Sequence, residues 1–355
     1  MANPMAESIT PPCEIAMRPR NGRWRRCLGA LLCVGLSGLF LYLAVRKADF
    51  LEVRRALGAI HLYWLLPLIV VALVDFWLRA VRWTWMFPPD SRPTVWQCFS
   101  TFVIGTLTNN LVPGRIGDIA RAGMIGRLVP AFGSSGAFAT VVLEKVADGL
   151  MLLALLGVAL LVAPLPAWLG KTGAIGSLVF LGSLLLLLVV NAHSKVNRTK
   201  ADARAEESHY GKMSAAIQRS LQRFALGLNA LNSKRQILAV LIVTLAIWLL
   251  EFSFIFVVFL MFGLNLPFVA AIVTGVILSV GMMLPAAPGF IGTYQFFTVT
   301  GLKLYHVPDS QALAVAIFLN LFVFANSTLL GMFALSIKAL GRLLPMAKCV
   351  AGGAK

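Results

Sequence analysis

Six apolar runs of about 20 residues alternate with shorter polar segments along the chain. An α-helix needs about 20 predominantly apolar residues to cross the hydrocarbon core of a bilayer. The first run is long for a signal peptide and lacks a small-residue cleavage pattern, so we interpret it as an uncleaved anchor. The pattern predicts six membrane-spanning helices, at Leu28–Val45, Tyr63–Phe87, Phe138–Ala163, Ile175–Asn191, Ile237–Gly263 and Ala312–Ile337.

Two further apolar runs, Val95–Val112 and Phe268–Leu284, are each followed by Pro-Gly and a second helical stretch. Proline and glycine break helices, and broken backbone at membrane depth is tolerated only where it is buried in protein or lines a wet cavity. The breaks carry matching motifs, PGRIG at 113–117 and PGFIG at 288–292. The predicted helix-break residues are Pro113, Gly114, Gly117, Pro288, Gly289 and Gly292.

The two motifs lie about half the chain apart, and an apolar run of similar length precedes each. This spacing is typical of an inverted repeat with discontinuous helices that meet near the membrane midplane. We predict an all-α, polytopic integral membrane bundle with two inverted repeats, each with a broken or re-entrant helix pair. The predicted divisions are an N-terminal arm (1–27), one membrane domain (28–337) with halves at about 28–191 and 237–337 joined by a loop (192–236), and a tail (338–355).

Composition supports the membrane interpretation. Of the 355 residues, 59% are hydrophobic and 13% are charged, against about 25% charged in a soluble domain. Mean hydropathy is +0.84, which argues against a soluble or disordered chain. The net charge of +17 would suggest nucleic acid on a soluble protein. Here the basic residues lie mostly between apolar runs, so we expect membrane lipids and no nucleic acid as partners.

The positions of the basic residues also predict an orientation. With both termini in the cytoplasm, most of the 31 Lys and Arg residues lie inside, as the positive-inside rule requires. We therefore predict a multi-pass protein of a bacterial-type inner membrane, with cytoplasmic N- and C-termini. The few external basic residues are Arg46, Lys47, Arg54, Arg55, Lys171 and Lys303.

Two loops have apolar residues at helical spacing. Met213–Leu231 predicts an amphipathic helix, either lying on anionic headgroups at the cytoplasmic face or packed on another protein surface. Phe50–Ile60 carries a shorter stripe of the same kind in the first external loop.

Charged residues follow the first break at a spacing of three: Arg115, Asp118 and Arg121. If a helix begins near Arg115 or Ile116, these side chains share one face, beside free amides that attract anions. Guanidinium groups bind phosphate or carboxylate in bidentate fashion, which indicates an anion site. The alternative is a cytoplasmic cluster that only sets topology.

The third predicted span contains Glu144, Lys145 and Asp148. Ionisable residues inside a span indicate a functional site by default. We expect Arg121 and Arg115 to be their partners, with a purely structural ion-pair network as the alternative.

Other spans carry charge as well. Asp75 and Arg79 are one turn apart, and Arg82 lies on the same side, near the predicted inner end of the span. We expect snorkelling there rather than substrate contact. Glu251 lies mid-span without a local partner, so it faces the interior, where it either pairs with a base from the first half or carries a coupling proton.

The second break carries neutral polar groups. Tyr294 and Gln295 can hydrogen-bond a headgroup, whereas Asn320 and Asn326 are expected to hold helices together. The predicted substrate-binding residues are Asn109, Asn110, Arg115, Asp118, Arg121, Glu144, Lys145, Asp148, Tyr294 and Gln295.

No motif for soluble-type catalysis is present. The five cysteines show no paired spacing, the four histidines are far apart, and neither G-x-S-x-G nor a P-loop occurs. We expect no metal, no cofactor and no enzymatic reaction.

The stretches NNLVPGRIGDIAR (109–121) and ATVVLEKVADG (139–149) resemble the transmembrane domain of lysylphosphatidylglycerol synthases and the stand-alone flippase-like proteins related to it. Asp118 stands where that family usually has Glu, Lys145 where it usually has Arg, and Gln295 where many relatives carry an acid. The sequence ends about 18 residues after the last predicted span. The resemblance therefore implies lipid translocation without the aminoacyl-transfer domain of the synthases.

The main functional hypothesis is translocation of a polar lipid, anionic or aminoacylated, across the inner membrane. Two alternatives stay open at this point. One is an accessory subunit that presents a lipid to a lipid- or glycan-modifying membrane enzyme. The other is an ion-coupled transporter of a small solute, which the inverted repeat would also suit.

Overall fold

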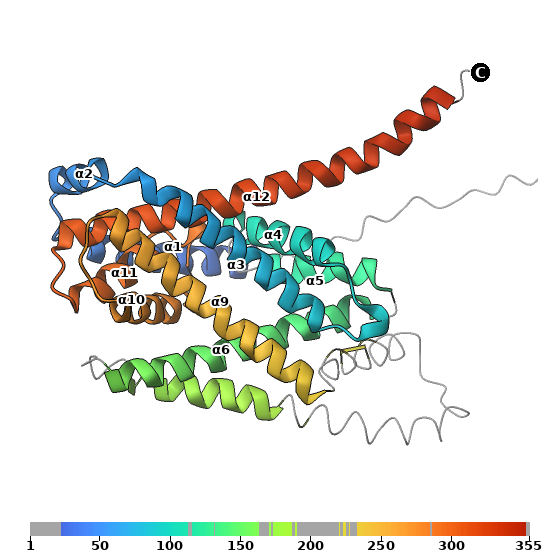
Figure 1. The fold of residues 1–355 in the computed structure, drawn as a ribbon, viewed down its shortest axis with the longest axis horizontal. Helices are drawn as coiled ribbons and strands as arrows, with labels where there is room; N and C mark the ends of the chain where they lie inside the picture. Colours follow the sequence, from blue (N-terminus) through green and yellow to red (C-terminus); the bar gives the residue numbers. More distant parts are fainter. Residues whose placement is uncertain are drawn as a thin grey trace, which may run out of the picture.

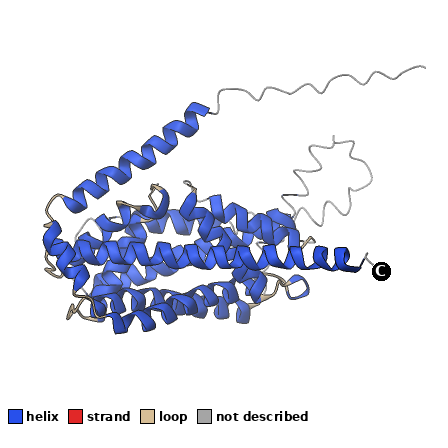
Figure 2. Cartoon of the chain, turned by 90° about the horizontal axis from the view of Figure 1, so that it is seen from above, coloured by secondary structure: helices blue, strands red, loops and turns tan. Residues whose placement is uncertain are grey.

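The structure is a computed structural model, and it describes residues 23–112, 116–130, 132–162, 170–171, 173–186, 189, 220, 223–224, 227, 233–284 and 286–352. Throughout these residues every regular element is a helix, and no strand occurs among them (Figure 2). The all-α prediction is therefore confirmed. The elements are α1 (Arg23–Val45), α2 (Phe50–Gly58), η2 (Leu62–Trp64), α3 (Leu65–Trp85), η3 (Pro89–Ser91), α4 (Val95–Leu111), α5 (Ile116–Leu128), α6 (Gly133–Val162), α9 (Lys234–Met261), α10 (Phe268–Gly281), η4 (Pro288–Phe290), α11 (Thr293–Lys303) and α12 (Asp309–Gly352).

Three helices are long and apolar enough to cross a membrane: Leu62–Trp85, Lys234–Met261 and Asp309–Ile337. Each coincides with a predicted span. Shorter apolar helices occur at Val34–Val45, Gly173–Leu186 and Phe268–Gly281. Helix α6 covers the remaining predicted span with 30 residues, although it carries charged side chains. The six-span topology and its orientation remain predictions.

Two pairs of short helices lie at opposite ends of the long axis, α4–α5 at one end and α10–α11 at the other (Figure 1). Their lengths are 17, 13, 14 and 11 residues. At 1.5 Å per residue, each is shorter than the hydrocarbon core of about 30 Å. The longer helices α3, α9 and α12 run between the two ends.

The two halves of the chain interlock through these helices. Helix α4 of the first half packs on α12 of the second, α10 of the second packs on α6 of the first, and α3 packs on α9. Asn110 on α4 donates hydrogen bonds to the hydroxyls of Ser327 (2.8 Å) and Thr328 (3.2 Å) on α12. We call α4–α5 the first hairpin and α10–α11 the second, since the two helices of each pair pack on each other. Each hairpin is therefore held by the opposite half of the chain.

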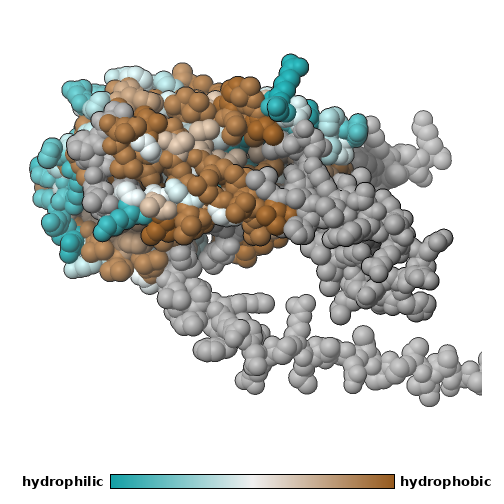
Figure 3. All heavy atoms as spheres, turned by 90° about the horizontal axis from the view of Figure 1, so that it is seen from below, coloured by the Kyte–Doolittle hydropathy of each residue, from teal (hydrophilic) through white to brown (hydrophobic). Residues whose placement is uncertain are grey.

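The core has two parts that match the two hairpins. One apolar cluster surrounds α9 to α12, and a second joins the end of α3 to α4, α5 and the start of α6. The outer surface is apolar around the middle of the molecule, and polar residues gather toward the two ends (Figure 3). Leu66, Leu161 and Leu178 are among the large apolar side chains that point outward. This distribution is that of a membrane protein, in which lipid covers the apolar band.

Local sequence explains how the first hairpin begins and breaks. Thr94 and Gln97 form a capping box at the start of α4, with reciprocal hydrogen bonds of 2.9 and 3.2 Å. The helix ends at Leu111, and Val112 adopts an extended conformation because the residue before a proline disfavours the helical region. Helix α5 begins at Ile116, as predicted. Pro113, Gly114 and Arg115 lie outside the described residues.

At the second break, Pro288 opens the 3₁₀ turn η4, and Gly292 has a φ of 90°. A side chain on Gly292 would overlap the carbonyl oxygen of Ser37 on α1. The hydroxyl of Ser37 accepts a hydrogen bond from the backbone N–H of Ala287 (2.8 Å). Helix α1 therefore packs tightly against the second break and is hydrogen-bonded to it.

The predicted amphipathic loops have different outcomes. Within Phe50–Ile60, residues Phe50–Gly58 form α2, which buries Val53 and packs on α12. Most of Met213–Leu231 lies outside the described residues. Within it, Arg223 and Gly227 lie against the start of α6, next to Gly133 and Gly136, so this part contacts protein.

Candidate functional site

A cavity of about 350 Å³ lies between the two halves of the chain. Helices α3, α4, α5 and α6 line it from the first half, and α9, α10, α11, α12 and the η4 turn line it from the second. Much of its wall is apolar. The polar residues that line it are Asp75, Arg79, Thr106, Asn109, Asn110, Asp118, Arg121, Lys145, Glu251, Ser279, Tyr294, Asn320, Asn326 and Ser327.

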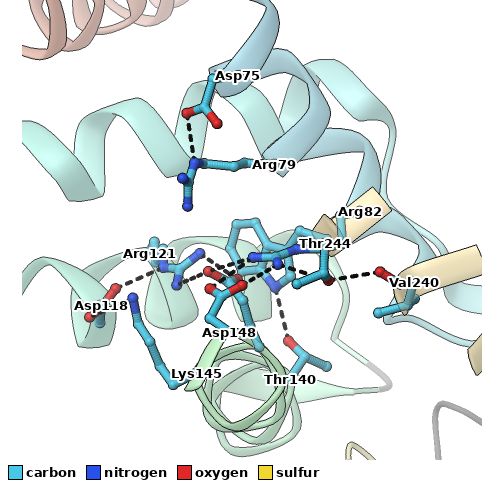
Figure 4. Close-up of polar contacts among 12 residues, drawn as sticks. Asp75, Arg79, Arg82, Asp118, Arg121, Thr140, Lys145, Asp148, Val240 and Thr244 are labelled. Atoms are coloured by element: carbon cyan, nitrogen blue, oxygen red, sulfur yellow. Dashed lines mark hydrogen bonds and ion pairs between the residues drawn. The ribbon is translucent and has the colours of Figure 1, made fainter. Parts of the chain in front are cut away.

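Arg121 is the most heavily bonded charge at the cavity. Its two terminal nitrogens donate to the carboxylate of Glu144 at 3.0 and 3.1 Å, and its Nε donates to Asp118 at 3.1 Å (Figure 4). The guanidinium carbon also lies 4.9 Å from the Trp83 ring centre and 5.0 Å from that of Phe102. The predicted pairing of Glu144 with Arg121 is confirmed. Glu144 lies behind Arg121 and does not line the cavity.

Arg82 forms a second buried cluster beside the first. It donates to both carboxylate oxygens of Asp148, lies 3.5 Å from Glu144, and donates to the hydroxyl of Thr244 at 3.1 Å (Figure 4). Its side chain is fully buried. The expectation that Arg82 snorkels is therefore wrong, because partners on α6 and α9 satisfy the charge inside the bundle. Asp148 pairs with Arg82, whereas its expected partner Arg115 lies outside the described residues.

Arg79 links the two halves of the chain. Its Nε donates to Asp75 at 2.7 Å, one turn earlier on α3, and an Nη nitrogen donates to Glu251 on α9. Arg79 points from α3 toward the charged cluster on α5 and α6 (Figure 4). The expectation that Glu251 pairs with a base from the first half is confirmed. The snorkelling expectation is wrong for Arg79 too, since its side chain lines the cavity.

Lys145 is the most accessible cation of the site. Its side chain is 47% exposed, and its Nζ lies 3.7 Å from Asp118. It lines the cavity. Because this contact is long and exposed, Lys145 is free to reach a ligand in a way that the buried arginines are not.

Most of the side-chain amides near the two breaks form hydrogen bonds with backbone groups and so fix the local chain conformation. Asn109 accepts a hydrogen bond from the N–H of Gly117 (2.7 Å), which fixes the start of α5. Gln295 accepts from the N–H of Gly292 (2.6 Å) and donates to Asn320 (3.1 Å). Asn320 in turn donates to the carbonyl of Gly289 (2.9 Å). Gln295 does not line the cavity, so the structure places this predicted ligand-binding residue in the scaffold of the second break.

Six of the predicted substrate-binding residues thus meet at one cavity. Glu144, Asp148 and Gln295 lie outside its wall, and Arg115 lies outside the described residues. The residues that line the cavity are Asn109, Asn110, Asp118, Arg121, Lys145 and Tyr294. Their role in binding a substrate stays a prediction.

The sequence analysis missed the ion pairs that the arginines of α3 form inside the bundle. Arg79 and Arg82 are three residues apart in an apolar span, and Glu144 and Asp148 are four apart in another. Two faces of opposite charge on separate spans predict pairing, since unpaired charge inside a membrane is costly. That signal was available without the structure.

The charges of the site nearly cancel. The cations are Arg79, Arg82, Arg121 and Lys145, and the carboxylates are Asp75, Asp118, Glu144, Asp148 and Glu251. Within the described part of the chain, no three His, Cys, Asp or Glu side chains are arranged to hold a metal ion.

Long apolar helices, an apolar outer band and a charged cavity between two halves define a polytopic α-helical membrane protein. The chain belongs to the family described as the lysylphosphatidylglycerol synthase TM region, which matches residues 30–331. This family connects the protein with membrane lipids. Comparisons with curated proteins and with solved structures gave no match.

Proposed function

We propose that the protein translocates a polar lipid, anionic or aminoacylated, between the leaflets of a bacterial-type inner membrane. The observation that carries this proposal is the cavity between the halves, where Arg79, Lys145 and Glu251 line a wall that is otherwise largely apolar. Charged groups are rare inside membrane proteins and mark the pathways of polar substrates. The family connection with lipids favours a lipid as that substrate.

The size of the cavity suits a headgroup rather than a whole lipid. At about 350 Å³ it is near the lower end of the roughly 300–1,000 Å³ typical of small-molecule sites. The headgroup would occupy the cavity, and the acyl or prenyl chains would stay in the bilayer. The polar wall would replace the water that a charged headgroup loses when it leaves the interface, which is the main cost of crossing.

The two pairs of short helices supply a way to open the cavity to each side of the membrane in turn. Helices α4–α5 and α10–α11 lie at opposite ends of the molecule (Figure 1), each followed by a longer helix. This arrangement supports an inverted repeat with re-entrant hairpins. In such folds one half rocks against the other around a central site, which opens alternately to the two sides.

The test is movement of fluorescent phosphatidylglycerol and of its lysyl ester across proteoliposome membranes, followed by quenching of the outer leaflet. Wild type should move at least one of them, and Lys145→Gln should slow it. Lys303→Gln is a matched control, because Lys303 pairs with Asp309 (2.5 Å) away from the cavity.

Three results would contradict the proposal. Lipid binding without movement would indicate an accessory subunit that presents lipid to a membrane enzyme. Uptake of a water-soluble ligand without lipid movement would indicate a small-solute transporter. A folded protein that neither binds nor moves either lipid would contradict a lipid function.

A further inference from the structure

We infer that Arg79, rather than Arg121, receives the phosphate of the headgroup, and that it does so by exchanging the carboxylate of Glu251 for that phosphate. This inference rests on the proposed function, because it places a lipid headgroup in the cavity. It assigns different roles to arginines that look equivalent in the sequence, and it gives Glu251 a role in releasing one half of the chain from the other.

Arg121 already uses three of its five guanidinium N–H donors on buried carboxylates. All three of its guanidinium nitrogens donate to carboxylates, two to Glu144 and one to Asp118. Aromatic rings lie near its guanidinium at 4.9 and 5.0 Å, and the residue is 1% exposed. A phosphate could bind there only by breaking a buried bidentate pair, which leaves an uncompensated carboxylate inside the protein.

Arg82 is excluded because it is buried away from the cavity. It is 0% exposed, it bonds both oxygens of Asp148 and the hydroxyl of Thr244, and it does not line the cavity. Arg82 and Arg121 together hold α3 and α5 onto α6.

Arg79 differs in the partner that it holds at the cavity. Asp75 is on the same helix and orients the guanidinium from behind. Glu251 comes from the other half of the chain, and its side chain is 39% exposed. Both carboxylates line the cavity. The more exposed carboxylate is the weaker competitor for a guanidinium, because an ion pair that is less enclosed by protein is held less tightly.

The exchange conserves charge at Arg79. A phosphodiester and a carboxylate each carry one negative charge, and guanidinium binds both with the same fork of donors. The phosphate therefore takes the position that Glu251 occupies, and the Glu251 side chain turns into the cavity.

The exchange also changes the interface between the halves. The Arg79–Glu251 pair joins α3 to α9, two helices that pack along each other. When phosphate replaces Glu251, this cross-link opens. Headgroup binding then favours separation of the halves, which is the motion that alternating access requires.

Two substitutions that break the same ion pair separate this inference from a structural role. Arg79→Gln removes the phosphate receptor, so the Kd for short-chain phosphatidylglycerol should rise by on the order of tenfold. Glu251→Gln removes the competing charge, so that Kd should fall by a similar factor. If the Arg79–Glu251 pair only held the two helices together, both substitutions would change the Kd for phosphatidylglycerol in the same direction.

The measurement is a titration of purified full-length protein in detergent with fluorescent dioctanoyl-phosphatidylglycerol. Arg79→Lys is the second variant, in case Arg79→Gln does not fold. It keeps the charge but loses the bidentate fork, so we expect an intermediate Kd. Lys303→Gln should match wild type. Competition with sn-glycerol 3-phosphate and with uncharged dioctanoylglycerol tells whether the site takes a free phosphate, a lipid headgroup or only acyl chains.

Opposite shifts for Arg79→Gln and Glu251→Gln would support the inference, even if proteoliposomes showed no lipid movement and the translocation proposal failed. Equal Kd values in wild type and both variants, or shifts in the same direction, would overturn it while leaving translocation possible. Binding of dioctanoylglycerol as tight as that of phosphatidylglycerol would overturn it as well.

Discussion

Arg121 on α5 and Glu144 on α6 form a bidentate ion pair in which both side chains are 2% exposed. The pair joins the second helix of the first hairpin to the long helix that follows. Its two parallel hydrogen bonds, of 3.0 and 3.1 Å, fix the angle as well as the distance between the helices. The pair is structural: Arg121 lines the cavity, and Glu144 holds it from behind the wall.

Arg121→Ala should destabilise the protein strongly. Removing one partner of a buried pair typically costs about 3–5 kcal/mol, because the remaining charge is uncompensated. The measurement is the thermal midpoint in detergent, followed by size-exclusion chromatography. Arg127→Ala is the matched control, since Arg127 lies exposed in the last turn of the same helix. A thermal midpoint for Arg121→Ala equal to that of wild type would contradict a structural role for the Arg121–Glu144 pair.

Gly117→Ala should disrupt the first hairpin. A Cβ at this position would overlap the carbonyl oxygen of Gly105 on α4, and overpacking of this kind typically costs about 1–3 kcal/mol. Gly123→Ala, in the same helix, meets open space and should be neutral or raise stability by up to about 1 kcal/mol. Thermal midpoints of the two variants check the contrast. Equal midpoints would show that α4 and α5 do not cross this closely.

Gly292→Ala should loosen the second break. Its φ of 90° disfavours any L-residue, and the new methyl group would meet the carbonyl of Ser37. We expect a lower thermal midpoint, and faster proteolysis between α10 and α11. Gly38→Ala on α1 provides the control, because a Cβ there meets nothing. Proteolysis at the wild-type rate in Gly292→Ala would argue against the tight packing of α1 on the second break.

Lys145→Gln should separate function from stability. Its exposed contact with Asp118 contributes at most about 1 kcal/mol, so the thermal midpoint should change little. Loss of the accessible cation should slow movement of phosphatidylglycerol by on the order of tenfold, if Lys145 makes a charge-assisted bond to the headgroup. Lys145→Arg should retain most of the rate. Full activity of Lys145→Gln in proteoliposomes would remove this residue from the site.

Periodicity and hydropathy predicted the helices well because those properties are local. The predicted start of α5 and the end of α4 at Val112 agree with the structure, since proline and glycine determine them within a few residues. The pairing of Glu144 with Arg121 was also predictable, because an acid in a span requires a base and Arg121 lies on the preceding helix.

Partners from distant parts of the chain were harder to predict. Arg82 looked like a snorkelling residue because it lies near the predicted inner end of its span. Its actual partner, Asp148, lies 66 residues away on α6, so the spacing of charges within α3 alone does not reveal the pair. The bonds of Gln295 to Gly292 and Asn320 were equally hidden from the sequence, since they depend on the shape of the second break.

The hydrogen bond from Asn110 to Ser327 spans 217 residues and has a consequence for biosynthesis. At about 5–20 residues per second, α12 emerges from the ribosome roughly 10–40 s after α4. During that interval the first hairpin lacks the helix that covers it, and the Asn110 amide lacks its final partner in a solvent that offers few others. The newly made first half therefore depends on membrane insertion factors, or on retained water, until the last helix arrives. A chain that stops before α12 is expected to be degraded rather than to persist as a half-folded protein.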